Sequence, residues 1–391
     1  MKKILYIEGS SRINYPADPA VNVGGSTISL YYLVKDLDRK KFKPAVFSYY
    51  DSYVFKEFSK LNCRVMIDAR KRKKRKSKKY FQAVFKEDFY ESLSFFKLFL
   101  LRILPRALKL VSILKKEKPD IVHCNLSLRQ SMAPIIASRI ACIPCICHVR
   151  GYTRLNSLNK AFSHFVRCFI CVSDTARSNY LMQGIKKEKT VVIPLGIDAQ
   201  EFLPVSHHTQ KEKDFIVTSV GRMNEWKGQW ILLEAIPLIT QKIKNVQFWL
   251  VGDGPERPNL ERKAHVLNIS QFVKFKGTFH RIQNILSSSD LLIHTPVKPE
   301  PFGRIIIEAM AMQIPVIATN LGGPSEYITN NRDGILIDTK RPDVLAEKIV
   351  QVLENPDLRQ KMGEAARKTV IKQFDNKNIM KEIERIYDII A

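Results

Sequence analysis

Glu300 and Glu308 are eight residues apart and flank the start of a predicted helix. Pro301 and Gly303 are typical of the end of a loop, and the apolar pattern that follows predicts a buried helix over 304–312. The first N–H groups of a helix and the positive end of its dipole together favour a phosphate. Two nearby carboxylates would accept hydrogen bonds from sugar hydroxyls. The pattern suits a diphosphate with a sugar on one side and a ribose on the other, although a buried amphipathic helix with an ordinary N-terminal acid would also fit.

Arg222 and Lys227 form a second candidate group, on a loop bounded by Gly221 and Gly228. The apolar run 215–220 predicts a strand, and the helix expected over 228–240 follows the loop. Two cations five residues apart suit a diphosphate leaving group, whose charge they would stabilise as the bond breaks. Two solvated surface cations are the alternative.

Gly24, Gly25 and His148 are the candidates in the first half of the chain. The glycine pair precedes a helix expected over 26–36 and would let a ligand approach the backbone closely. His148 is next to last in the strand expected over 144–149, at the edge where open α/β sheets bind ligands. Each signal is weak by itself, because a lone histidine or a glycine pair is more often structural.

The elements that must position these residues alternate between short apolar strands and longer amphipathic helices. This alternation predicts α/β architecture with two doubly wound, Rossmann-like domains. We expect an N-terminal domain over 1–200, a polar linker over 201–213, a C-terminal domain over 214–372 and a last amphipathic helix over 373–391. The chain contains no G-x-x-x-x-G-K-[ST] loop and no G-x-G-x-x-G after its first strand, which argues against a P-loop enzyme and a dinucleotide dehydrogenase.

The charge of the chain is strongly asymmetric. Of the net +26, residues 1–200 carry +23 and residues 201–391 carry +3. The first half is therefore expected to meet an anionic partner. The apolar run 4–7 is too short for a signal peptide, and no apolar run is long enough to cross a bilayer, so the chain is expected to be cytoplasmic.

Residues 70–118 combine a polybasic run with a predicted amphipathic helix. In 70–79 every residue but Ser77 is basic, and 92–118 is rich in Phe and Leu with basic residues interspersed; Pro105 is expected to kink that helix. An apolar face beside a polybasic loop favours contact with an anionic membrane surface. The alternative without a function is a solvated loop. Nucleic acid is disfavoured as the partner because no nucleic-acid-binding motif accompanies the basic residues.

All seven cysteines lie in the first half. Cys142-x-x-Cys145 and Cys168-x-x-Cys171 could be interpreted as a zinc pair. Most of these cysteines lie in apolar runs typical of buried parallel strands, however, so packing thiols and no metal site are expected.

Taken together, the motifs resemble glycosyltransferase family 4, the retaining transferases with the GT-B fold. The pieces occur in the family's order over most of the chain, most clearly over 215–340: Gly24-Gly25, His148, Gly221-Arg222 to Lys227-Gly228, Val251-Gly252-Asp253-Gly254, Gly277, and Glu300 to Glu308 with Pro301-Phe302-Gly303. The basic segment has no fixed counterpart in the family. Arg304 also departs from the pattern, because many relatives have Thr or an apolar residue there.

The resemblance implies two Rossmann-like domains that face a central cleft, with the nucleotide-diphospho-sugar in the second and the acceptor in the first. It implies that Glu308 holds the ribose, Glu300 holds donor-sugar hydroxyls, and Arg222 and Lys227 clamp the diphosphate. The remaining implied roles are a phosphate cradle from the amides of Phe302, Gly303, Arg304 and Gly25, and a sugar-orienting role for His148. It also implies that no metal or other cofactor is needed, and that the last helix crosses back to the first domain.

We therefore expect a retaining glycosyltransferase that moves a sugar from a UDP- or GDP-sugar to a glycan or lipid-linked glycan, in cell-surface polysaccharide synthesis on the inner face of the cytoplasmic membrane. A phosphorylase or nucleotide-sugar epimerase of the same fold is one alternative, and a non-catalytic basic binding protein is the other. The sugar, the base, the acceptor and the oligomeric state do not follow from the sequence.

Overall fold

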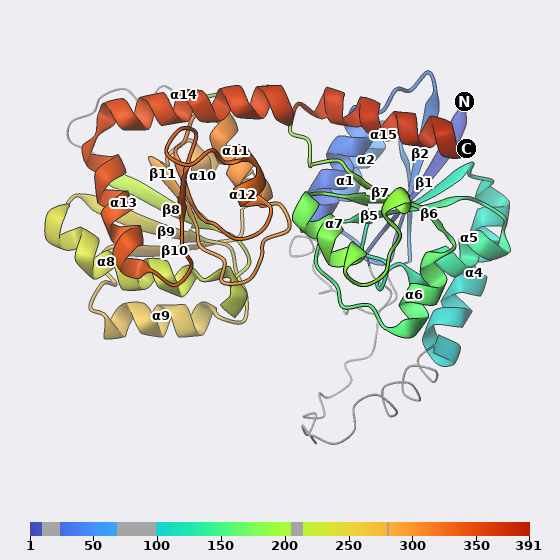
Figure 1. Ribbon diagram of the computed structural model, residues 1–391, viewed down its shortest axis with the longest axis horizontal. Coiled ribbons are helices and arrows are strands. Elements are labelled where there is room, and N and C mark those ends of the chain that lie inside the picture. Colours follow the sequence, from blue (N-terminus) through green and yellow to red (C-terminus); the bar gives the residue numbers. More distant parts are fainter. Residues whose placement is uncertain (10–23, 69–98, 205–213, 280) are drawn as a thin grey trace. The chain divides into compact units, whose positions relative to one another are not determined.

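The computed structural model describes residues 1–9, 24–68, 99–204, 214–279 and 281–391. The chain divides into two compact units (Figure 1). The first unit contains Met1–Val172, Arg177–Ile193 and Met380–Ala391, and the second contains Ser173–Ala176 and Pro194–Ile379. The polybasic run 70–79 and most of the expected linker, 205–213, lie outside the described residues.

The first unit is built on a seven-stranded parallel sheet with the order β3-β2-β1-β4-β5-β6-β7. Its strands are β1 (Lys2–Glu8), β2 (Phe42–Ser48), β3 (Arg64–Ile67), β4 (Ile121–Cys124), β5 (Cys145–Val149), β6 (Val166–Cys171) and β7 (Thr190–Val192). The helices that begin in this unit or follow its strands are α1 (Gly25–Lys35), α2 (Val54–Lys60), α4 (Leu104–Glu117), α5 (Met132–Ile140), α6 (Ser157–Ser163) and α7 (Asp174–Leu181). The order reverses at β1, so the loops after β1 and β4 flank a topological switch point, where ligands bind in such sheets.

Helix α4 is the described part of the amphipathic segment. A short π-helix, Phe99–Ile103, precedes it, and Pro105 lies in its first turn. Proline is tolerated there because the N–H that it lacks would have no partner inside the helix. Within the described residues, Pro105 therefore lies at the beginning of the α-helix. The segment expected over 92–118 is described only from residue 99, so the kink stays a prediction.

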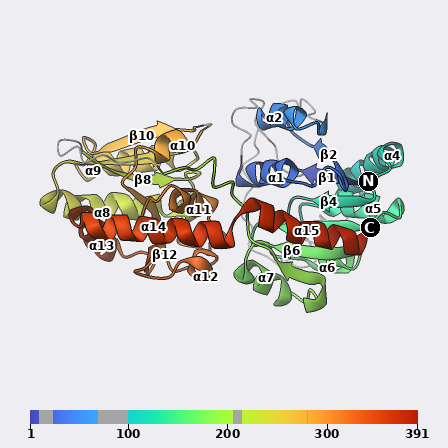
Figure 2. The same cartoon turned by 90° about the horizontal axis from the view of Figure 1, so that it is seen from above.

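The C-terminal helix α15 (Asn376–Ile390) packs against the first sheet through its last three turns (Figure 2). Tyr387 and Ile383 are fully buried. The hydroxyl of Tyr387 donates to Tyr6 on β1 (3.1 Å) and lies 2.6 Å from Nδ1 of His123 on β4. The end of the chain is thus a structural part of the unit that contains its beginning.

The second unit has a six-stranded parallel sheet with the order β10-β9-β8-β11-β12-β13. Its strands are β8 (Phe215–Val220), β9 (Val246–Val251), β10 (Val273–Gly277), β11 (Leu291–His294), β12 (Val316–Thr319) and β13 (Ile335–Ile337). Its helices are α8 (Gln229–Lys242), α9 (Arg257–Val266), α10 (Gln283–Leu286), α11 (Arg304–Ala311), α12 (Pro324–Tyr327), α13 (Pro342–Glu354) and α14 (Pro356–Gln373). The predicted alternation of strands and helices is confirmed in both units.

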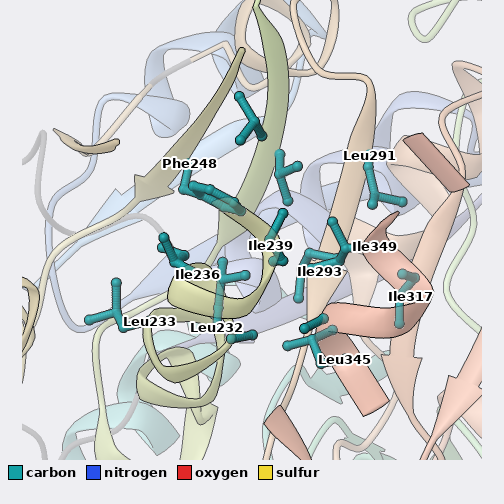
Figure 3. Packing of buried hydrophobic residues seen from close by; sticks show 14 of the residues in the cluster. Leu232, Leu233, Ile236, Ile239, Phe248, Leu291, Ile293, Ile317, Leu345 and Ile349 are labelled. Carbon is teal, nitrogen blue, oxygen red and sulfur yellow. The ribbon is translucent and has the colours of Figure 1, made fainter. Parts of the chain in front are cut away.

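The core of the second unit lies between the sheet and the helices α8 and α13 (Figure 3). Leu232 and Ile236 of α8, Leu345 and Ile349 of α13 and Phe248 of β9 are at most 1% exposed. Each such aliphatic or aromatic side chain stabilises the fold by about 1.5–3 kcal/mol through removal from water. This rigid layer fixes the carboxyl ends of the strands, from which the candidate site residues project.

Candidate active site

Three loops meet at the carboxyl edge of the second sheet. Two follow strands β8 and β11, and the third contains the turn Gly252–Gly254 after β9. Gly228 has a φ of 64°, and a Cβ there would overlap the carbonyl oxygen of Thr295. A Cβ at Gly252 would likewise overlap the carbonyl oxygen of Gly221. These two glycines therefore allow the loops to pack backbone against backbone.

Helix α11 begins at Arg304, as predicted, and Gly303 caps it with a φ of 83°. Few residues other than glycine adopt this left-handed conformation without strain. Phe302 is buried against Tyr327, whose hydroxyl donates to the Phe302 carbonyl oxygen (2.8 Å). Together these contacts fix the direction in which the first turn of α11 presents its N–H groups.

Glu300 lies in a charged cluster just before this turn. Its Oε2 accepts hydrogen bonds from Nζ of Lys227 (2.5 Å) and from Nε2 of His294 (3.1 Å). Lys227 also lies over the ring of Trp226, 4.3 Å from its centroid, which adds a cation–π contact. The structure therefore joins two predicted residues, Lys227 and Glu300, through a direct ion pair.

The ionisation of this cluster follows from its contacts. Burial acts to raise the pKa of the Glu300 carboxyl, but the hydrogen bond from His294 and the charge of Lys227 outweigh it and lower that pKa to about 2. Burial lowers the pKa of His294. At neutral pH the ring is therefore uncharged and donates its Nε2–H to the ionised Glu300.

Glu308 lies on the buried face of α11, one turn after Arg304. Its Oε1 accepts a hydrogen bond from Nε of Arg304 (2.7 Å). Burial raises the pKa of Glu308, and the neighbouring Arg304 opposes the change. The side chain of Arg304, whose role did not follow from the motif, thus orients the second predicted carboxylate.

Arg222 differs from Lys227, although the sequence treated them as a matched pair. Its side chain is exposed and has no ion-pair partner among the described residues. Within the second unit, Lys227 is already held, whereas Arg222 is exposed to solvent.

Gly24, Gly25 and His148 belong to the first unit. Gly24 caps α1 and Gly25 begins it. A Cβ at Gly25 would meet no atom of the described residues within 4 Å, so packing against that part of the chain does not require glycine there. His148 is 1% exposed, and its ring stacks on that of His123 with centroids 5.4 Å apart. Burial lowers the pKa of His148 well below its usual value, so the ring is neutral.

Two contributors to the second-unit site were missed by the sequence reasoning. His294 ends the apolar strand β11, which is the same signal that identified His148 at the end of β5. Tyr327 gave no signal, because its hydroxyl reaches the Phe302 carbonyl only through tertiary packing.

The cysteines do not form the suggested zinc pair among the described residues. Cys142 is exposed, while the sulfur atoms of Cys124, Cys145 and Cys147 lie within 4.8 Å of one another, fully buried. Burial raises the pKa of Cys124 and Cys147 well above that of a free thiol, whereas hydrogen bonds with these two thiols lower the pKa of Cys145. Full burial of all three sulfur atoms is typical of packing thiols, and the absence of a metal site stays a prediction.

Each half of the chain matches the profile of a known protein family. The profile described as "Glycosyltransferase Family 4" matches residues 23–201, and the profile "Glycosyl transferases group 1" matches residues 205–369. The chain belongs to the family 4 glycosyltransferases. Its two parallel sheets are those of the GT-B fold. The two family profiles and the names of its relatives identify it as a glycosyltransferase.

Two relatives and one solved structure are similar to this glycosyltransferase over most of its length. N-acetyl-alpha-D-glucosaminyl L-malate synthase of Bacillus anthracis is 26% identical over 72% of this chain and 77% of the relative. The UDP-Gal:alpha-D-GlcNAc-diphosphoundecaprenol alpha-1,3-galactosyltransferase of Escherichia coli is 28% identical over 74% and 80%. The crystal structure of Anabaena Alr3699/HepE in complex with UDP and glucose matches with a TM-score of 0.79 at 23% identity, over 99% of this chain and 100% of that one.

Among the described residues, no helix of this glycosyltransferase is both long enough and apolar enough to cross a bilayer.

Proposed function

We propose that this glycosyltransferase transfers a sugar from a UDP- or GDP-sugar to a hydroxyl group with retention of the anomeric configuration. The observation that carries the proposal is the cluster of Lys227, His294 and Glu300 at the first turn of α11, with Glu308 one turn inside that helix. A cation and helix amides suit a diphosphate, while the two carboxylates suit sugar hydroxyls. The UDP in the Anabaena structure and the UDP-Gal in the Escherichia coli name support such a donor.

In the proposed mechanism, the second unit binds the donor and stabilises the leaving group. Lys227, Arg222 and the first amides of α11 face the charge that develops on the diphosphate as the glycosidic bond breaks. Glu300 binds hydroxyls of the donor sugar and Glu308 binds the ribose. The acceptor hydroxyl attacks from the face that the diphosphate leaves, and a phosphate oxygen takes its proton. Gly25 and His148 of the first unit are assigned to donor binding by the family resemblance.

The proposal requires no metal ion, because protein cations and the helix dipole take its role. Treatment with a chelator is therefore expected to leave turnover unchanged. A loss of turnover that added Mg²⁺ or Mn²⁺ restores would contradict this part of the proposal.

The acceptor is proposed to be a glycan or a lipid-linked glycan of a cell-surface polysaccharide. The diphosphoundecaprenol named for the Escherichia coli relative supports this class. The malate named for the Bacillus anthracis relative is a small-molecule alternative within the same family.

The decisive experiment is a thermal-shift screen with UDP- and GDP-sugars, followed by an assay for free UDP or GDP. A bound donor stabilises the folded state by about 2.7 kcal/mol at a hundred times its Kd. We expect one nucleotide class to raise the melting temperature and to release nucleoside diphosphate when an acceptor is present. No shift with either class, or binding without nucleotide release, would contradict the proposed transferase chemistry.

Contact with an anionic membrane surface is proposed for the cytoplasmic enzyme from residues 70–118. In the described part, Leu101 and Leu108 are 66% and 55% exposed, and Lys115 and Lys116 are exposed on the same helical segment. Replacing the basic residues of 70–79 with Ser should weaken binding to anionic vesicles and spare cleavage of a soluble donor. Neutral vesicles provide the control, and unchanged binding to anionic vesicles would contradict the proposal.

A further inference from the structure

A buried polar network occupies the carboxyl edge of the first sheet, and Glu8 is at its centre. Glu8 ends β1 and is 1% exposed. Its Oε1 accepts hydrogen bonds from the hydroxyls of Tyr50 (2.9 Å), Ser26 and Thr27 (both 3.3 Å). Ser26 and Thr27 directly follow the Gly24-Gly25 pair, so Glu8 anchors the beginning of α1.

Asn125 extends this network from β1 to β5. Its Nδ2 donates to the other carboxylate oxygen of Glu8 and to the Ser26 carbonyl oxygen (3.0 Å). Its Oδ1 accepts from Nε of Arg150 (2.8 Å). The amide of Asn125 therefore has one direction available, with its nitrogen toward Glu8 and its oxygen toward Arg150.

Arg150 in turn reaches His148, two residues earlier on the chain. Its Nη2 lies 3.4 Å from Nδ1 of His148. A guanidinium only donates hydrogen bonds, so Nδ1 must be the acceptor. The neutral His148 ring then carries its proton on Nε2, and this buried Nε2 has no hydrogen-bond partner among the described residues.

We propose that Glu8, Asn125 and Arg150 are positioning residues that hold His148 as the Nε2–H tautomer and present that N–H as a hydrogen-bond donor to a sugar hydroxyl. The same hydrogen-bond network joins His148 to the first turn of α1, because Asn125 contacts both Arg150 and the Ser26 carbonyl oxygen. This inference rests on the proposed function for the identity of the ligand. The tautomer itself is a property of the protein without ligand.

The first test is the ¹⁵N spectrum of the ligand-free enzyme labelled at histidine, with the His148 signals assigned from His148→Gln. At neutral pH we expect a protonated Nε2 and an unprotonated Nδ1. Arg150→Met removes the donor to Nδ1 and should produce a mixture of tautomers, whereas Arg154→Met, an exposed arginine in the same loop, should not. An Nδ1–H tautomer, a charged ring, or an unchanged spectrum in Arg150→Met would overturn the proposal.

The second test exchanges the groups that join Glu8 to Asn125. Asn125→Asp places two carboxylates against each other and should lower kcat/KM for the donor by at least about tenfold. In the double variant that also has Glu8→Gln, the new amide at position 8 can donate a hydrogen bond to the carboxylate at position 125. That carboxylate still accepts from Arg150, and the two positions together keep the wild-type charge. The double variant should recover most of the loss together with the wild-type tautomer. If the double variant recovers thermal stability but not the Nε2–H tautomer of His148, then Glu8 and Asn125 only stabilise the fold and do not position His148.

The two tests separate this inference from the proposed function. If the wild-type enzyme binds no nucleotide-sugar, the tautomer spectra still decide whether the relay holds His148. If the tautomer changes in Arg150→Met while donor kcat/KM stays the same, the assigned role of His148 as a donor to the sugar is wrong.

Discussion

At the scale of single residues, the site depends on which charges are already paired before a ligand arrives. Lys227 forms an ion pair with Glu300, and Arg304 forms one with Glu308. These pairs hold side chains that would otherwise sample several rotamers, so less conformational entropy remains to be lost when a donor binds. Arg222 remains exposed, so its side chain would lose more conformational entropy when a donor binds.

Lys227→Ala is expected to lower turnover by about an order of magnitude or more, because it removes a cation from the developing charge on the leaving group. Steady-state release of nucleoside diphosphate measures the effect. Lys244→Ala, an exposed lysine just before β9 and so at the amino end of the sheet, is the control. Near-normal turnover in Lys227→Ala would refute the proposal that Lys227 stabilises the diphosphate leaving group.

Glu300→Gln should have a pH-dependent effect on stability. The folded pKa is about 2 and the unfolded pKa is about 4.3, so the ionised carboxylate stabilises the fold above pH 4.3 and this contribution is lost as the pH falls toward 2. The difference in unfolding free energy between wild type and variant should be constant above pH 6 and should narrow by about 2 kcal/mol at pH 3.

Urea titrations from pH 3 to pH 7 measure this difference. Glu354→Gln, at an exposed position at the end of α13, makes the same charge change without a buried partner. If the difference in unfolding free energy between wild type and Glu300→Gln increases as the pH falls, then Glu300 is not an ionised partner of Lys227.

At the scale of elements, the position of Lys227 depends on how closely the loop after β8 approaches the loop after β11. Gly228 lies against Thr295, the residue immediately after β11. The backbone of one loop therefore sets the place of the other, and with it the separation of Lys227 and Glu300.

Gly228→Ala should be more destabilising than Gly184→Ala. Both glycines have positive φ, 64° and 90°, so each variant has left-handed strain of about 1–2 kcal/mol. Only at Gly228 does the added Cβ overlap a neighbour, which should add about 1–3 kcal/mol. Urea unfolding gives the comparison, and equal losses at the two sites would mean that the loops are not in close contact.

At the scale of the whole molecule, the chain's last turns stabilise the unit that contains its first strand. Tyr387 is buried against Tyr6 and His123. The packing of the first sheet therefore includes a helix that lies more than 180 residues after its last strand.

Tyr387→Ala should destabilise the first unit by about 3–5 kcal/mol, as for other large buried aromatic residues. Hydrogen exchange followed by mass spectrometry should show loss of protection in peptides of the first unit, with little change in β8 to α13. Ile389→Ala, on the same helix but 83% exposed, should have little effect. Equal loss of protection in both units would contradict the assignment of Tyr387 to the first unit.

Much of this architecture was predictable because local patterns and tertiary packing agree. The apolar runs that predicted strands at 144–149 and 215–220 match β5 and β8. Helix α11 begins at the predicted residue because glycine and proline before it permit few other conformations.

The sequence by itself determined the family, the two sheets and the positions of Glu300, Glu308, Lys227 and Arg222 along the chain. These follow from spacing and periodicity, which are local properties. Only the tertiary structure decided that Lys227 pairs with Glu300, that His294 donates to the same carboxylate, and that Glu8 is linked to His148. Such pairings join residues up to about 140 positions apart, and no local pattern encodes them, because they depend on which strand ends become neighbours when a parallel sheet forms.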